Sequence, residues 1–163
     1  AHPNTQFCDG GAGQALASAA LVHALEGRRE QAEELIRDAL DALRFELRRR
    51  GQRDELFVLL VYAVLGRVSD VERVLRTDRA FAFSPGRSAA AALLTGRSSD
   101  VERGLARLDA MASRGDLFCA ALAEAIREEV AAAEGGPQPR HEALRRMGSN
   151  GWSEILSFRP TLA

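Results

Sequence analysis

The feature of this sequence that most constrains its fold is a phrase of eight residues that occurs twice. Gly-Arg-Val-Ser-Asp-Val-Glu-Arg occupies positions 66–73, and Gly-Arg-Ser-Ser-Asp-Val-Glu-Arg occupies positions 96–103, so seven of the eight positions are identical at an offset of 30 residues. A repeat of this length, with the same glycine and the same helix-start signal in each copy, is typical of stacked helical hairpins. The sequence therefore predicts an all-α fold built from about four antiparallel helical hairpins.

Apolar residues recur at helical spacing along most of the chain. The predicted helices cover Gln14–Glu26, Glu33–Arg50, Asp54–Leu65, a segment that starts at Ser69, Ser88–Thr95, Ser99–Ser113 and a segment that starts at Asp116. The Asp54–Leu65 helix is apolar on nearly all sides, which indicates a central position. Ser69 with Glu72, and Ser99 with Glu102, have the spacing of a capping box at a helix start.

The remaining segments divide the chain into three parts. Residues 1–13 are predicted to be irregular, residues 14–134 to form the repeat domain, and residues 135–163 to form a linker and a C-terminal helical cap. Within the repeat domain, Phe81–Gly86 is predicted to be a loop whose two phenylalanines contact the core, because a proline disfavours helix before it. In the cap, His141–Met147 and Trp152–Phe158 are predicted to be short segments that seal the last apolar face.

Composition excludes several classes of protein. The chain has 163 residues, of which 46% are apolar and 28% charged, and a net charge of −1, which is typical of a soluble globular protein and gives no electrostatic attraction to nucleic acid. Its most apolar run, Leu56–Leu65, has about half the length of a membrane span. Cys8 and Cys119 suggest neither a disulfide framework nor a zinc site, so a cytoplasmic protein is expected. The absence of lysine is interpreted as the codon bias of a GC-rich bacterial genome.

The hairpins resemble those of the tetratricopeptide family. Gly27, Ala32, Ile36 and Ala39 match the family's run of a turn glycine, a small residue, a large apolar residue and a second small residue, and Ala20 matches the small residue of the first helix. The later units keep the turn glycines and the large apolar residues, Gly66 with Leu75 and Gly96 with Leu105. The resemblance implies a short right-handed solenoid with a concave groove that binds a peptide or protein segment.

Two features of the sequence are candidates for binding such a partner. Arginines cluster around the predicted end of the second helix, where guanidinium groups could bind an acidic peptide: Arg44, Arg48, Arg49, Arg50 and Arg53. Trp152 is the second candidate, because tryptophan is enriched in binding hot spots. The structural interpretation of the arginines is a solvated helix end before Gly51, and that of Trp152 is core packing.

Catalytic and metal-binding motifs are weak. Cys8 precedes the first predicted helix in a glycine-rich segment, where a thiolate or a bound phosphate would be stabilised by the helix N-terminus. His23 and Glu26 share a helical spacing that would give a metal two ligands only. The leading hypothesis is a non-enzymatic scaffold or adaptor domain in a regulatory or multi-protein system, without cofactor or metal. The alternatives are a small enzyme or sensor that uses Cys8 or His23, and a homodimer.

Overall fold

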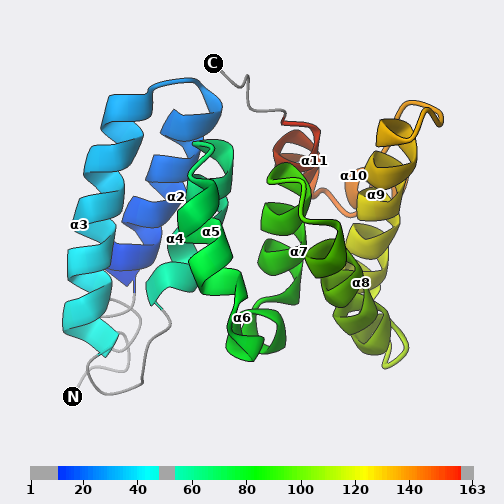
Figure 1. Ribbon diagram of the computed structural model, residues 1–163, viewed down its shortest axis with the longest axis horizontal. Coiled ribbons are helices and arrows are strands. Elements are labelled where there is room, and N and C mark those ends of the chain that lie inside the picture. Colours follow the sequence, from blue (N-terminus) through cyan, green and yellow to red (C-terminus); the bar gives the residue numbers. More distant parts are fainter. Residues whose placement is uncertain (1–10, 48–53, 159–163) are drawn as a thin grey trace.

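The computed structural model describes residues 11–47 and 54–158, and every regular element within these ranges is a helix (Figure 1). The prediction of an all-α chain is therefore confirmed for the described residues. The helices are α2 (Gly11–Leu25), α3 (Arg29–Leu47), α4 (Asp54–Val64), α5 (Val68–Leu75), α6 (Asp78–Phe83), α7 (Pro85–Leu94), α8 (Ser98–Ala112), α9 (Leu117–Ala133), α10 (Glu142–Arg146) and α11 (Asn150–Ser157).

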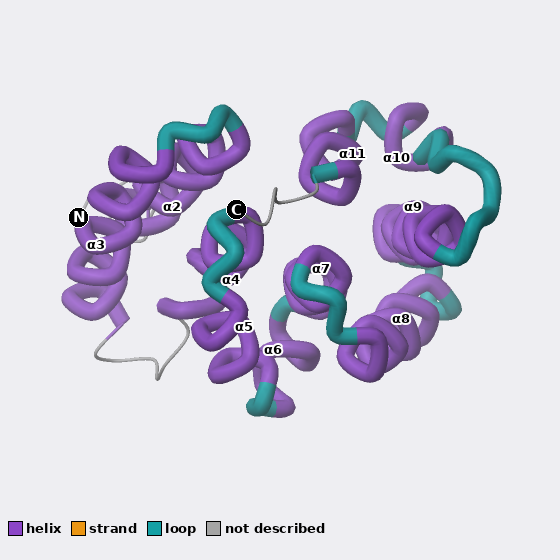
Figure 2. Tube along the Cα trace, turned by 45° about the horizontal axis from the view of Figure 1, so that its top comes forward, coloured by secondary structure: helices purple, strands orange, loops and turns teal. Residues whose placement is uncertain are grey.

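Helices that follow one another in the chain pack side by side. The pairs α2 with α3, α4 with α5, α7 with α8 and α8 with α9 are in contact, and α4 also packs against α2 on one side and α7 on the other. The last two helices fold back: α10 contacts α9, and α11 contacts both α9 and α7. Figure 2 shows that α11 lies on one side of α7 while α6 and α8 lie on the other. As a result, α7 has neighbours on several sides.

The core runs through α4 and α7. Residues 58–64 of α4 and Leu65 after it are all buried, as this uniformly apolar sequence predicts. In α7, Ala89 has no exposed surface and lies beside Gly104 of α8, where a Cβ atom at position 104 would come within 2.5 Å of the Ala89 Cβ. The small side chains therefore allow α7 and α8 to approach closely. Among the described helices, none is long and apolar enough to cross a membrane.

The two copies of the repeated phrase have the same local structure. Gly66 and Gly96 have φ values of 69° and 70°, in the left-handed region that favours glycine. The N–H of the following arginine, Arg67 or Arg97, donates to a carbonyl of the preceding helix at 2.8 Å in both copies. This is the bond that closes a Schellman turn. The two copies of the phrase therefore form the same type of turn.

The capping boxes predicted at Ser69 and Ser99 are wrong. The helices α5 and α8 begin one residue earlier, at Val68 and Ser98, and neither has a side-chain cap. The glycine turn sets the helix start instead, because the Arg67 carbonyl already accepts the N–H groups of Asp70 and Val71. Both copies of the phrase contain the same hydrogen bond between two side chains. Arg67 Nε donates to Asp70 Oδ2, and Arg97 Nε donates to Asp100 Oδ2, each at 2.7 Å.

The loop predicted at Phe81–Gly86 is also wrong. Helix α6 extends to Phe83, and α7 begins at Pro85, so that Ser84 alone separates the two helices. Proline is well tolerated as the first residue of a helix because the N–H that it lacks would have no partner there. Phe81 is buried as expected, but Phe83 is 54% exposed. Leu117, the first residue of α9, is 74% exposed.

Candidate functional site

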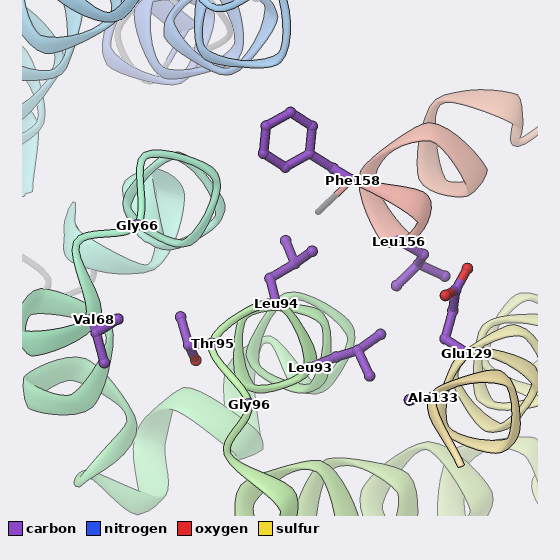
Figure 3. A pocket seen from close by; sticks show the side chains of 10 residues that line it. All are labelled: Gly66, Val68, Leu93, Leu94, Thr95, Gly96, Glu129, Ala133, Leu156 and Phe158. Carbon is purple, nitrogen blue, oxygen red and sulfur yellow. The ribbon is translucent and has the colours of Figure 1, made fainter. Parts of the chain in front are cut away.

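Two hollows lie near opposite ends of α7. The first, here called the upper cleft, has a volume of about 380 Å³ and is lined mainly by apolar groups of four helices and their turns. A volume of this size falls within the range of ligand-binding clefts. Its lining residues, shown in Figure 3, are Gly66, Val68, Leu93, Leu94, Thr95, Gly96, Glu129, Ala133, Leu156 and Phe158.

The repeated phrase builds two walls of the upper cleft. Gly66 and Gly96 both line the cleft, and a Cβ atom at either position would meet nothing within 4 Å. Figure 3 shows the Leu94 side chain extending from the end of α7 into the open space, and the Phe158 ring extending into it from the end of α11. Val68, at the start of α5, is 43% exposed. The cleft therefore presents partly exposed apolar side chains from α5, α7 and the end of α11.

One carboxylate stands among these apolar groups. The side chain of Glu129 is buried, and its Oε1 lies 2.9 Å from Nε2 of the buried His141. The neighbouring Glu128 accepts the backbone N–H groups of Arg140 and His141, at 2.6 and 2.9 Å. These contacts fix the chain between α9 and α10, where His141 has a left-handed φ of 50°. The two glutamates thus help to position α10 and α11 beside the upper cleft.

The lining of the upper cleft is mainly apolar. Thr95 supplies the hydroxyl of this lining, and its Oγ1 donates to the Ala91 carbonyl at 2.7 Å. A nucleophilic hydroxyl needs a base within hydrogen-bond reach, and this contact is made with a carbonyl of its own helix instead. The side chains that remain are mainly apolar, and they are suited to holding an apolar group away from water.

The second hollow, here called the lower groove, has a volume of about 440 Å³. Aromatic side chains dominate it: Trp152 meets Phe118 edge to face with ring centroids 6.0 Å apart, and the guanidinium carbon of Arg87 lies 5.2 Å from the centroid of the Phe57 ring. The complete lining is Leu56, Phe57, Phe83, Ser84, Pro85, Gly86, Arg87, Leu108, Met111, Asp116, Phe118, Cys119, Leu122 and Trp152.

Three titratable groups line the lower groove. Burial lowers the pKa of Arg87, because the charged guanidinium is partly removed from water. Burial also raises the pKa of the Cys119 thiol to about 11, helped by the nearby Asp116 carboxylate. The backbone N–H of Cys119 donates to Asp116 Oδ1 at 2.9 Å and lowers the pKa of that carboxyl. Asp116 is thus the N-cap of α9, whereas the Cys119 thiol stays neutral at physiological pH.

Of the sequence-predicted binding residues, the structure describes Arg44 and Trp152, which lie in different parts of the fold. Arg44 is an exposed residue of α3, and its guanidinium lies 3.7 Å from Asp41 of the same helix. Trp152 lines the lower groove on α11, so it does not share a hollow with Arg44. Arg48, Arg49, Arg50 and Arg53 lie outside the described residues.

The residues of the alternative sensor hypothesis are also only partly described. Cys8 lies outside the described residues. His23 is half-buried, and its Nδ1 accepts a hydrogen bond from Arg28 Nε at 2.8 Å. Within residues 11–47 and 54–158, no group of three or more histidine, cysteine, aspartate or glutamate side chains is placed to hold a metal ion.

Sequence reasoning missed Arg87, although a signal was present. Arg87 is the one charged residue between Arg79 and Arg97, in a stretch that is otherwise apolar or small. A lone cation in such a stretch is expected to be partly buried. Its aromatic neighbours on α4, α9 and α11 could not be identified from the sequence, because they come from distant parts of the chain.

Comparisons with known proteins supply no family for this architecture. No protein-family model matches the chain, and no curated protein or solved structure is significantly similar to it.

Proposed function

We propose that this chain is a non-enzymatic protein-interaction domain, a scaffold or adaptor that binds an apolar segment of a partner protein in the upper cleft. The observation that carries the proposal is the concentration of partly exposed apolar side chains there. Leu94 and Phe158 face the cleft from two helices, and Val68 adds an exposed side chain from a third. Removing such side chains from water stabilises a complex by roughly 25 cal/mol per Å² of apolar surface.

The order of helix contacts supports a stack of helical hairpins as the framework of this domain. The first helices of the proposed hairpins, α2, α4, α7 and α9, contact one another in succession. Three glycines with positive φ, Gly27, Gly66 and Gly96, connect α2 to α3, α4 to α5 and α7 to α8. In proteins of this architecture, stacked hairpins create extended surfaces for binding partners. The proposed framework is similar to the tetratricopeptide arrangement that the sequence resembles.

The position of α11 indicates what kind of segment the cleft would hold. This two-turn helix is amphipathic: Ile155 and Leu156 are buried, while Glu154 is exposed, and the helix contacts both α7 and α9. The upper cleft continues from its last residues toward the turn at Gly66. We therefore propose that the partner contributes an amphipathic helix whose apolar side chains lie beside α11, a common mode of helix-in-groove recognition.

Selection from a displayed library of amphipathic peptides tests the proposal, with Val68→Asp as the diagnostic variant. Val68 is the exposed first residue of α5, where an added carboxylate is favourable for the helix but places a charge in the apolar cleft. The matched control is Ser98→Asp, because Ser98 holds the same position in the second copy of the phrase and does not line the cleft.

The proposal predicts that selected peptides bind the wild type and the Ser98→Asp variant equally and bind Val68→Asp at least tenfold more weakly. Circular dichroism should show the same helix content and the same melting temperature within a few degrees for all three proteins. If the selection yields no binder, or if the binders retain their affinity for a folded Val68→Asp variant, the upper cleft is not a protein-binding site.

A further inference from the structure

The lower groove has a chemistry of its own, because it combines aromatic rings with a half-buried cation. We infer that Arg87 binds the carboxylate of an acidic residue in a partner protein, while an apolar side chain next to that residue packs against Phe118 and Trp152. The inference rests on the proposed function in that it assumes a protein partner. It uses different residues from the upper cleft, so that each site can be tested alone.

Most arginines of the described residues are paired with a carboxylate or exposed to solvent. Ten of the described arginines lie within 4.0 Å of a carboxylate oxygen: Arg28, Arg29, Arg44, Arg67, Arg73, Arg76, Arg97, Arg103, Arg127 and Arg146. Of the described arginines without such a contact, all are exposed except Arg87. Arg87 is therefore the partly buried arginine of this group whose charge is not balanced by a described carboxylate.

The guanidinium group of Arg87 is partly removed from water. Arg87 lies over the Phe57 ring, and removal of water lowers its pKa, so the surroundings disfavour its charge. The carboxylate of Asp116 lines the same groove, but it accepts the Cys119 N–H and lies beyond ion-pair distance of Arg87. A carboxylate from a ligand would supply the bidentate acceptor that a guanidinium group fits best. Such bonds are stronger in a partly dehydrated site than in water.

The exposed side chains around the lower groove indicate what kind of molecule would supply the carboxylate. Exposed large apolar side chains gather at this groove: Phe83 and Met111 line it, and Leu117 stands between its lining residues Asp116 and Phe118. Clustered apolar exposure beside polar groups is typical of protein-binding surfaces. Side chains from α4, α6, α7, α8, α9 and α11 line the groove, whose volume is about 440 Å³. An acidic peptide with large apolar neighbours therefore fits better than a small free carboxylate.

Trp152 allows a direct test, because it is the single tryptophan of the chain and lines the groove. The probe is a peptide with blocked ends, acetyl-Ser-Leu-Phe-Glu-Leu-Ser-amide, and the comparison peptide replaces Glu with Gln. Tryptophan fluorescence is followed as each peptide is added to the wild type, to Arg87→Met and to the control variant Arg107→Met. Methionine keeps an apolar chain at position 87, and Arg107 is an exposed arginine of α8 outside the groove.

The inference predicts that the wild type and Arg107→Met bind the Glu peptide at least tenfold more tightly than the Gln peptide, and that Arg87→Met removes this preference. The melting temperature of Arg87→Met should be unchanged or raised, since a partly dehydrated charge is lost. Equal affinity of the two peptides for the wild type would overturn the inference. So would a preference that persists in Arg87→Met, or a melting temperature lowered by several degrees, which would assign Arg87 a structural role on Phe57.

Two further measurements separate the possible failures. Phenylacetate presents a carboxylate and a ring without a peptide, and the inference predicts that it binds at least tenfold more weakly than the Glu peptide; equal binding would assign the groove to small carboxylates. Val68→Asp should bind the Glu peptide like the wild type. If the Glu peptide binds through Arg87 while the upper cleft selects no peptide, the proposed function fails at the cleft and the lower groove stands. The opposite result removes the lower groove alone.

Discussion

The Nε2 atom of His141 lies 2.9 Å from Oε1 of Glu129, and the two side chains are 2% and 7% exposed. This contact joins the start of α10 to the C-terminal part of α9, and the two backbone hydrogen bonds to Glu128 reinforce it. Because Glu129 also lines the upper cleft, the same carboxylate supports the C-terminal helices and forms part of the site wall. The position of α11 beside the cleft therefore depends on this buried pair.

Replacing His141 with alanine should destabilise the C-terminal helices. A buried polar group that loses its partner costs about 1–3 kcal/mol, so we expect the free energy of unfolding of His141→Ala to fall by about 2 kcal/mol. Urea denaturation measures the change, and amide hydrogen exchange should become faster in α11 before it does so in α4. The control is Glu142→Ala, which removes an exposed pair with Arg146 and should cost less than about 0.5 kcal/mol. Equal losses in the two variants would contradict the role of the pair.

Replacing three glycines with alanine separates the stability cost of close packing from that of a left-handed backbone. Gly104→Ala places a methyl group 2.5 Å from the Ala89 Cβ and should cost about 2 kcal/mol by overpacking. Gly96→Ala has open space but a φ of 70°, so a cost of about 1 kcal/mol is expected from the left-handed backbone alone. Gly151→Ala, within α11 and with neither constraint, should stabilise the protein by about 0.5 kcal/mol. Thermal melts rank the three variants, and any other order contradicts the packing between α7 and α8.

The two aspartates of the repeated phrase should differ in their effect on stability although their bonds are alike. Asp100 is 12% exposed in its side chain and Asp70 is 25% exposed, and each accepts an arginine Nε at 2.7 Å. Loss of the more buried bond in Asp100→Ala should cost about 2 kcal/mol. Loss of the other in Asp70→Ala should cost less than about 1 kcal/mol. Chemical denaturation of both variants checks the prediction, which fails if Asp70→Ala is the more destabilised.

Cys119 should be a slow nucleophile. The thiolate is the reactive form, and burial raises the pKa of this thiol to about 11, so the neutral thiol predominates in the folded protein below that pH. In a Cys8→Ser variant, iodoacetamide should therefore alkylate the folded protein at pH 8 about 100-fold more slowly than the same chain in urea. The rate should continue to rise between pH 9 and pH 11. A rate that levels off below pH 9 would contradict the raised pKa.

The sequence predicted the helices because their apolar periodicity is local information. Helix bounds agreed with the pattern within a few residues for α2, α8 and α9, where a glycine or an N-cap aspartate marks an end. The start of α5 at Val68 was missed because the Schellman turn at Gly66, rather than Ser69, controls it. The short helix α6 was missed because Pro85 was interpreted as a break, whereas it begins the next helix.

The candidate sites were less predictable, since each combines side chains that are distant in the chain. Trp152 was a candidate binding residue from the sequence, but Phe118 and Phe57, which line the same groove, lie about 34 and 95 residues away in the chain. The pairing of Glu129 with His141 depends on how the linker folds back on α9, which no local pattern encodes. The sequence places Arg87 alone in a stretch of apolar and small residues, which indicates partial burial, but whether a carboxylate pairs with it depends on how the chain folds.

¹⁵N–¹H correlation spectra recorded with and without a selected peptide show directly whether the peptide binds in the upper cleft. The account predicts that peptides chosen from the amphipathic library shift the amide signals of Leu93–Gly96, Val68 and the end of α11, and leave α2 and α3 unchanged. Shifts confined to α2 and α3, or no site-specific shift at saturating peptide, would contradict the proposal that the upper cleft is where this protein binds its partner.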